Sequence, residues 1–254
     1  MKNLKQTFQK YNIPQNAIGI YGQHPCKSAL LNTNRNFFLL CTTKHKIDYW
    51  KQFLSLQNIN LKIALFEPSE LDIITSSNNH QNIVLYVSKI YRKSLIEYLR
   101  NINQPNQKIV ILDQLTDPQN VGSIIRSAFA FNFDAVCLLR NNSPTETPAL
   151  IKASAGEIEN INIIELGNLV QEIKLLKKNN FFVYGLDGEG LIEINKIENN
   201  NDNVALIVGA EGKGLRNLTK KNVDQILRIN INSQCNSLNA ANAAAVAMYE
   251  LSKN

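Results

Sequence analysis

Apolar runs and helix-like patterns alternate along almost the whole chain. In the first third, short runs rich in β-branched and aromatic residues predict strands, and spacings typical of an amphipathic helix predict two helices. The predicted strands are 17–22, 37–43, 61–67 and 82–89, and the predicted helices are 23–32 and 46–58. This order predicts a small α/β unit that ends near Lys93.

The rest of the chain repeats the alternation with longer apolar runs. KIVILD at 108–113 is continuously apolar up to Asp113, which is typical of a parallel strand buried on both faces. Further strands are predicted at 135–140, 161–166, 181–187, 204–212 and 225–231, and helices at 117–131, 147–159 and 169–179. Strands that alternate with helices indicate a mostly parallel sheet covered on both faces, so both parts are assigned to the α/β class.

The same pattern divides the chain into four segments. Residues 1–16 carry several lysines and no apolar core, so they predict a flexible basic tail and not a secretory signal. Residues 17–93 form the first domain and 108–254 the second. Between them, residues 94–107 begin as a helix, then lose periodicity and gain Pro105, so we predict a linker there.

Composition narrows the function classes. The longest apolar stretches fall well short of the roughly 20 residues that a membrane-spanning helix needs, so we expect a soluble protein. The net charge of +6 favours a polyanionic partner such as RNA, although many enzymes share such a charge. Four widely separated cysteines and three histidines argue against a structural metal site and suggest reduced thiols in a cytoplasmic protein.

Ligands of parallel α/β sheets bind beyond the carboxyl ends of the strands, so we expect a binding or active site in the loops after residues 113, 187 and 209. In the first loop, Asn120 and Arg126 lie near a predicted helix start. The planar guanidinium of Arg126 suits a phosphate or a ribose oxygen. The alternative, that Asn120 caps the helix and Arg126 lies on its solvated face, stays open at this point.

Two further glycine-rich loops follow predicted strands. In the stretch VALIVGAEGKG, Gly209, Gly212 and Gly214 surround Glu211, so the backbone can approach a ligand closely or adopt positive φ. The glycine spacing matches neither the dinucleotide-binding fingerprint nor the P-loop. DGEG at 187–190 predicts a turn whose two acidic side chains are solvated.

The carboxyl-terminal stretch begins a predicted helix with Ser237, Leu238 and Asn239 ahead of a run of alanines. A small polar residue there suits a helix cap, and alanine has the best helix propensity. Polar side chains and free N–H groups at a helix start can equally form part of a ligand site. Both interpretations stay open on this stretch alone.

Together, the loops resemble the three motifs of the SpoU (TrmH) branch of the SPOUT RNA methyltransferases. DPQNVGSIIRSA resembles the first motif, with Asn120 and Arg126 in the positions of its asparagine and essential arginine. ALIVGAEGKGLR resembles the second, with Glu211 as its acidic residue, and SLN resembles the third, with Ser237 and Asn239 matched. Because the motifs occur in order at family-like separations, the resemblance is specific, and it extends over most of the chain after residue 16.

The resemblance implies a fold and an activity. It implies an L30e-like RNA substrate-binding domain at 17–93, a SPOUT catalytic domain with a trefoil knot at 108–254, and a homodimer. The nearest subgroup is the RlmB type, which transfers a methyl group from S-adenosylmethionine to a guanosine ribose 2′-hydroxyl in large-subunit (23S) ribosomal RNA. The family positions place the cofactor, without any metal, at a set of apolar and glycine residues. They are Leu186, Gly209, Gly212, Ile229 and Leu238.

The family pattern also suggests roles for the matched polar residues. Arg126 grips a phosphate or stabilises the developing alkoxide, because a guanidinium is a poor base; Asn120, Glu211, Ser237 and Asn239 orient it and the ribose. The chain departs from the family at Asn230, Ile231 and Ser233, where a Pro-Met pair and a glycine are usual, which changes the stiffness of the cofactor loop. The alternatives are a transfer-RNA 2′-O-methyltransferase and a non-catalytic RNA-binding ribosome-assembly factor of the same fold.

Overall fold

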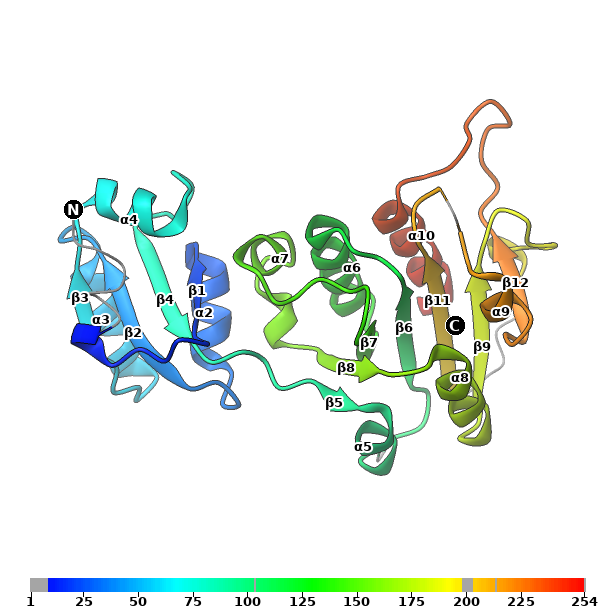
Figure 1. Ribbon diagram of the computed structural model, residues 1–254, viewed down its shortest axis with the longest axis horizontal. Coiled ribbons are helices and arrows are strands. Elements are labelled where there is room, and N and C mark those ends of the chain that lie inside the picture. Colours follow the sequence, from blue (N-terminus) through cyan, green and yellow to red (C-terminus); the bar gives the residue numbers. More distant parts are fainter. Residues whose placement is uncertain (1–8, 103, 198–202, 213, 254) are drawn as a thin grey trace. The chain divides into compact units, whose positions relative to one another are not determined.

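The computed structural model of the chain describes residues 9–102, 104–197, 203–212 and 214–253. The chain divides into two compact domains (Figure 1). The N-terminal domain contains Met1–Tyr91 and Glu146–Asn160, and the C-terminal domain contains Arg92–Thr145 and Ile161–Asn254.

The N-terminal domain is a four-stranded sheet with helices packed on it, as the alternation predicts. The strands are β1 (Ile18–Tyr21), β2 (Phe37–Thr42), β3 (Ile63–Leu65) and β4 (Ile83–Val87), in the order β1-β4-β2-β3. β4 runs antiparallel to both β1 and β2, whereas β3 is parallel to β2. The predicted helices are confirmed as α2 (Gln23–Leu31) and α3 (Ile47–Leu56).

A further helix of this domain, α4 (Pro68–Thr75), is absent from the sequence prediction. Its start carries a recognisable signal, because Glu67 and Glu70 form a reciprocal capping box and Pro68 occupies the first turn. Both arrangements satisfy or remove backbone N–H groups that a helix start leaves unpaired. The local chemistry therefore encodes the helix even though its apolar periodicity is weak.

The prediction of one long helix at 147–159 is wrong. The segment forms α7 (Pro148–Ala153) and the 3₁₀ helix η1 (Glu157–Glu159), separated by Ala155 and Gly156 at φ 54° and 91°. The segment also belongs to the N-terminal domain. The buried guanidinium of Arg35 binds Glu159 through its Nε and Nη2 atoms at 3.0 and 2.6 Å and also pairs with Glu146. A buried ion cluster thus holds the segment Glu146–Asn160 in the N-terminal domain.

Two other predicted boundaries differ from the structure. Residues 1–8 of the predicted tail lie outside the described residues, but Ile13 is 6% exposed and belongs to an apolar cluster of the N-terminal domain. The predicted linker 94–107 begins with structure that belongs to the C-terminal domain. There, β5 (Lys93–Ser94) pairs with β8, and α5 (Leu95–Arg100) buries Leu95 and Tyr98 in the core.

The C-terminal domain contains an eight-stranded sheet in the order β10-β12-β9-β11-β6-β7-β8-β5. Every neighbouring pair is parallel, which confirms the predicted parallel sheet. The strands after β5 are β6 (Lys108–Asp113), β7 (Ala135–Leu139), β8 (Asn162–Leu166), β9 (Phe181–Leu186), β10 (Ile192–Glu193), β11 (Asn203–Gly209) and β12 (Gln225–Arg228). The last predicted strand therefore ends at Arg228, before residue 231.

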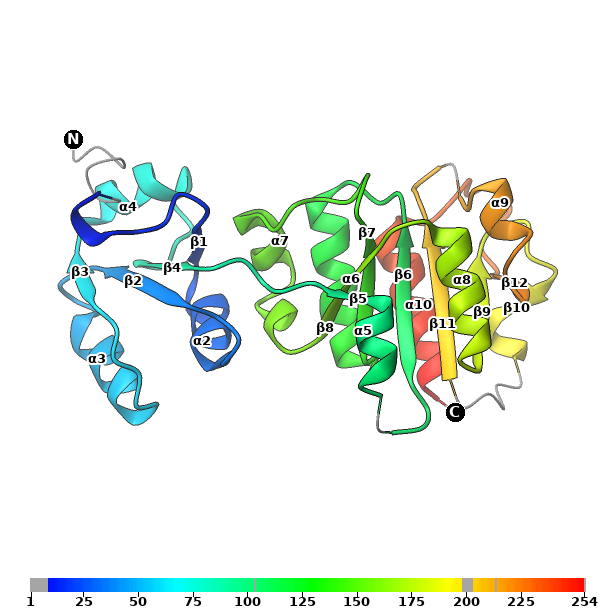
Figure 2. The same cartoon turned by 60° about the horizontal axis from the view of Figure 1, so that its bottom comes forward.

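Helices cover both faces of this sheet. They are α6 (Pro118–Ala130), α8 (Leu169–Lys178), α9 (Asn217–Lys220) and α10 (Ala240–Ser252), with a 3₁₀ helix η2 (Ile194–Lys196). α6 and α10 lie side by side on one face, and α5 and α8 cover the other (Figures 1 and 2). Ala244 and Ala247 of α10 are completely buried, so the short alanine side chains let this helix lie close to its neighbours. The trefoil knot stays a prediction.

The strand register places the functional loops. Gly209 at the end of β11 pairs with Asp113 at the end of β6, and Val208 pairs with Leu186 at the end of β9. Three neighbouring strands therefore end at the same level. The loops that follow them emerge from one edge of the sheet, where ligands of parallel α/β sheets bind.

Candidate active site

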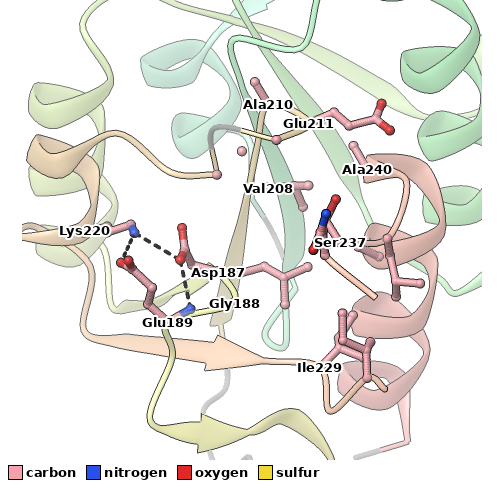
Figure 3. A pocket seen from close by; sticks show the side chains of 18 residues that line it. Asp187, Gly188, Glu189, Val208, Ala210, Glu211, Lys220, Ile229, Ser237 and Ala240 are labelled. Atoms are coloured by element: carbon pink, nitrogen blue, oxygen red, sulfur yellow. Dashed lines mark hydrogen bonds and ion pairs between the residues drawn. The ribbon is translucent and has the colours of Figure 1, made fainter. Parts of the chain in front are cut away.

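A pocket of about 340 Å³ opens at the carboxyl ends of β9 and β11 (Figure 3). Its volume falls in the range of small-molecule and cofactor clefts, about 300–1,000 Å³. Its walls come from the loops after these strands and from the start of α10. The lining residues are Leu186, Asp187, Gly188, Glu189, Val208, Gly209, Ala210, Glu211, Gly212, Gly214, Lys220, Ile229, Ile231, Asn236, Ser237, Leu238, Ala240 and Ala243.

Most of the residues predicted from the sequence line this pocket. The lining includes the whole predicted cofactor set and two of the predicted catalytic residues, Glu211 and Ser237. Ile231, one of the departures from the family pattern, lines it as well. Figure 3 shows Glu211 at the rim with its carboxylate directed away from Asp187, and Ser237 facing the pocket from the side of α10. The fold thus brings the second and third motifs to one cavity.

A side-chain hydrogen bond joins the third motif to the first. Asn239 is the N-cap of α10, and its Oδ1 accepts from the backbone N–H groups of Ala241 and Asn242 at 2.9 and 3.3 Å. Its Nδ2 donates to Oδ1 of Asn120 at 2.9 Å. One amide therefore caps a helix and links two motifs, so the two interpretations of this helix start are compatible.

The structure separates the two interpretations of the first motif. Asn120 does not cap α6, because Asp117 is the N-cap and accepts from the N–H of Gln119 at 3.0 Å. Arg126 is exposed on α6 and is not among the described residues that line the pocket. Asn239 lies between the lining residues Leu238 and Ala240 and holds Asn120, but neither asparagine is among the described residues that line the pocket. Within one copy of the chain, Arg126 lies on a solvated helix face.

The glycines of the second motif are needed for two reasons, close packing of the backbone at Gly209 and positive φ at Gly212 and Gly214. A Cβ added to Gly209 would lie 2.3 Å from both the carbonyl carbon and the oxygen of Gly214. The N–H of Gly214 donates to the oxygen of Ala210 at 2.9 Å, which folds the loop back on itself. Gly212 and Gly214 have φ values of 74° and 62°, a region that glycine adopts readily. The predicted positive φ is thus confirmed at Gly212 and Gly214, while the role of these glycines in binding the cofactor stays a prediction.

Asp187 is a site residue that the sequence analysis missed. The expectation of a solvated carboxylate holds for Glu189, which is 82% exposed, but is wrong for Asp187, whose side chain is 6% exposed. Burial opposes ionisation of Asp187, yet the N–H groups of Leu215 and Glu189 and the ammonium of Lys220 outweigh it and lower its pKa. The available signal was its position directly after a predicted strand that ends beside the glycine loop.

The pocket has the chemistry to hold a nucleoside-like cofactor. Side chains of Leu186, Val208, Ile229 and Leu238 give it apolar surface, and the glycine loop exposes backbone N–H and carbonyl groups beside them. An aromatic ring can lie against the apolar part while its polar edge meets the backbone. Figure 3 shows the opposite, polar side, formed by Asp187, Glu189 and Lys220.

Neither a candidate metal site nor a membrane-spanning helix occurs in the part of the chain that the structure describes. Among these residues, no group of three or more His, Cys, Asp or Glu side chains could hold a metal ion. Within the same residues, no helix has the length and apolar character needed to cross a membrane.

Comparisons with known proteins identify the family of the chain. The model of the SpoU rRNA Methylase family matches residues 107–249. A Staphylococcus aureus protein, whose name provisionally assigns it to the TrmH family of tRNA/rRNA methyltransferases, is 32% identical over 235 residues, which is 91% of this chain and 94% of that protein.

Solved structures share the fold over both domains. The SpoU methyltransferase AviRb from Streptomyces viridochromogenes, solved in complex with the cofactor AdoMet, has a TM-score of 0.80 at 20% identity and covers 99% of this chain and 93% of its own. An AdoMet-bound rRNA methyltransferase from Sinorhizobium meliloti has a TM-score of 0.77 at 21% identity, covering 98% and 90%. With a family match over more than half of the chain and a relative 32% identical over nearly all of it, this chain belongs to the SpoU/TrmH family of RNA methyltransferases.

Proposed function

We propose that the chain methylates a ribose 2′-hydroxyl of RNA with S-adenosylmethionine, and that its target is a guanosine of large-subunit ribosomal RNA. The observation that carries the proposal is the pocket at the ends of β9 and β11, where the glycine loop meets Ser237, two residues before the Asn239 side chain that donates to Asn120. Family membership, and the AdoMet bound to two structural neighbours, support this choice of cofactor.

The residues present fit this cofactor. Leu186, Ile229 and Leu238 would hold the adenosine, and the backbone around Gly209 and Gly212 would supply hydrogen bonds to it. Gly209 and Gly214 lie so close together that position 209 has no room for a side chain. This part of the cavity wall is therefore backbone. When bound, the sulfonium supplies an already activated methyl group.

The chain's own polar groups would then align the ribose and manage charge. Asn239 is fixed by the cap it makes and by Asn120, so it can hold a ribose oxygen in one orientation. Ser237 and Glu211 offer further polar atoms at the pocket. Arg126 would bind an RNA phosphate or stabilise the developing alkoxide, while water or the RNA phosphate accepts the proton.

Arg126 lies outside the pocket of its own copy, so we propose that a homodimer completes the site. The exposed face of α6 that carries Arg126 also carries Phe129, which is 41% exposed. The adjoining helix α10 exposes Val246 and Tyr249 at 40% and 49%. Large apolar side chains gathered on two packed helices are typical of an interface, and a second copy docked there would bring its Arg126 with it. Light scattering should give twice the 28.6 kDa chain mass, whereas a concentration-independent monomer would contradict the dimer.

The RNA class is the finer part of the proposal. The description of the S. meliloti neighbour as an rRNA methyltransferase supports ribosomal RNA, and the net charge of +6 favours a polyanion. Transfer RNA is the second candidate, since the name of the S. aureus relative includes both RNA classes. Mapping ribose methylation in both RNAs from a deletion strain decides between them.

A methyl-transfer assay with matched arginine variants tests the activity. Arg126→Ala should abolish transfer of a tritiated methyl group to ribosomal RNA without lowering the melting temperature, because Arg126 is exposed. Arg140→Ala is the control, since its side chain is 69% exposed, pairs with Glu165 of β8 and is not among the described residues that line the pocket. Full activity of the Arg126 variant would contradict the mechanism. Absence of cofactor heat with the wild-type protein in calorimetry would favour the non-catalytic alternative.

A further inference from the structure

Two buried aspartates flank the glycine loop, one at the end of each strand that borders β11. Asp113 is the last residue of β6, and Asp187 directly follows β9. Because Gly209 pairs with Asp113 while Val208 pairs with Leu186, the three strands present Asp113, Gly209 and Asp187 at the same level. The side chains of Asp113 and Asp187 are 1% and 6% exposed.

Asp187 binds the carboxyl end of the loop from the pocket side. Its Oδ2 accepts from the N–H of Leu215 at 3.0 Å, and its Oδ1 lies 3.0 Å from Nζ of Lys220 in α9. The same carboxylate accepts from the N–H of Glu189 and so fixes its own turn. Hydrogen bonds to an ionised, buried acceptor are stronger than those between neutral groups.

Asp113 binds the same segment from the opposite side. Its Oδ2 accepts from Oγ1 of Thr219 at 2.9 Å and from Nε of Arg216 at 3.1 Å, and its Oδ1 lies 2.8 Å from the second guanidinium nitrogen of Arg216. A second cavity of about 290 Å³ adjoins this side of the loop and shares Ala210 and Gly214 with the first. The loop is therefore a thin wall between two cavities.

Apolar packing seats the loop between its two carboxylates. Leu215 is 2% exposed, and its side chain packs against Gly185 of β9. A Cβ added to Gly185 would lie only 2.6 Å from Cδ1 of Leu215. A side chain at position 185 would push Leu215 away from β9. The two aspartates thus hold four residues of this segment: Asp187 binds Leu215 and Lys220, and Asp113 binds Arg216 and Thr219.

We infer that Asp113 and Asp187 are positioning residues that clamp residues 214–220, and that this clamp holds the glycine loop in the shape that binds the cofactor. The inference rests on the proposed function for its ligand, but not for the clamp itself. Neither aspartate has to contact the cofactor. A loop released from the clamp would lose the wall between the two cavities, so cofactor affinity would fall while the sheet remained folded.

Asp187→Asn tests the clamp, with Asp224→Asn as a matched control. Asp224 has the same chemistry elsewhere in the domain: its carboxylate accepts from the N–H of Val183 at 2.8 Å and pairs with Lys177 at 2.9 Å, and it does not line the pocket. Both variants lose a charge-assisted hydrogen bond, so both should lower the melting temperature. Only Asp187→Asn should weaken S-adenosylmethionine binding in calorimetry, by about tenfold, since it alone releases the loop.

Hydrogen exchange of the ligand-free protein provides a second readout. In Asp187→Asn the amide of Leu215 should exchange about tenfold faster, while amides in β11 keep their protection. Thr219→Val keeps the buried volume but removes a hydrogen-bond donor to Asp113, so it should also speed hydrogen exchange of the Leu215 amide. These exchange measurements test whether the two aspartates hold residues 214–220 even if the wild-type protein binds no S-adenosylmethionine. That absence of binding would overturn the proposed function and not the clamp. Unchanged Leu215 exchange in both variants, or equal loss of affinity in Asp187→Asn and Asp224→Asn, would overturn the clamp.

Discussion

Replacing Gly209 by alanine tests whether the pocket depends on close backbone packing. The added methyl group would lie 2.3 Å from the carbonyl carbon and oxygen of Gly214 and 2.7 Å from the nitrogen of Leu215, against 3.4 Å for ordinary van der Waals contact. All three neighbours are backbone atoms, so no side-chain rotation can relieve the overlap. The loop or the end of β11 must move.

The expected loss of stability lies at the upper end of the range for overpacked sites, about 3 kcal/mol. For a domain of this size, this corresponds to a fall in melting temperature of roughly 6–12 °C. Gly167→Ala is the control, since the nearest atom to its added Cβ is the Glu172 carboxylate oxygen at 3.8 Å. Differential scanning fluorimetry measures stability and calorimetry measures S-adenosylmethionine affinity. Wild-type values for both quantities in Gly209→Ala would refute the reasoning.

Three further predictions concern the closing helix and Asp187. Ala244→Leu should lower the unfolding free energy by about 1–3 kcal/mol, because Ala244 is fully buried in α10; an unchanged melting temperature would contradict this. Asn239→Ala should cost about 1–2 kcal/mol, whereas Asn239→Ser, which can still cap the helix, should keep most of the stability and lose methyl transfer; equal activity of Asn239→Ser and wild type would argue against the link to Asn120. The lowered pKa of Asp187 means that its ionised form stabilises the fold above its ordinary value of 3.8 and that this contribution is lost as the pH falls through the lower folded-state pKa. Urea unfolding should therefore show the stability gap between wild type and Asp187→Asn closing in acid below about pH 4, and a gap that widened there would be inconsistent with the lowered pKa.

The sequence pattern was sufficient for most strands and for the parallel sheet. Continuous apolar runs such as 109–112 and 204–209 are buried throughout, and strands buried on both faces have such runs, so the sequence pattern identifies them. The prediction failed where local signals are short. α4 begins with a capping box and has little apolar periodicity, and the short strand β5 has a partner distant in sequence, β8, that no local pattern reveals.

The excursion at 146–160 shows a second kind of failure. Its residues have a helix-compatible pattern, but Gly156 interrupts the helix, and a Cβ there would meet Ser28 and Pro25 of the N-terminal domain at 2.8 and 3.0 Å. Arg35 recruits Glu146 and Glu159 from far along the chain. Domain membership here is decided by a buried ion cluster, which becomes visible only when the chain is folded.

For the site, the sequence by itself predicted the loops after residues 187 and 209 that line the pocket, because strand ends and glycine spacing are local properties. It also determined the residues of the three motifs, including Asn239 as a polar helix start. Tertiary structure alone decided that Asn239 donates to Asn120, that Arg126 stays outside the pocket of its own copy, and that Asp187 is buried while Glu189 is exposed. The physical reason is that burial, pairing and ionisation depend on neighbours brought together by the sheet register, and the chain encodes that register only through the whole fold.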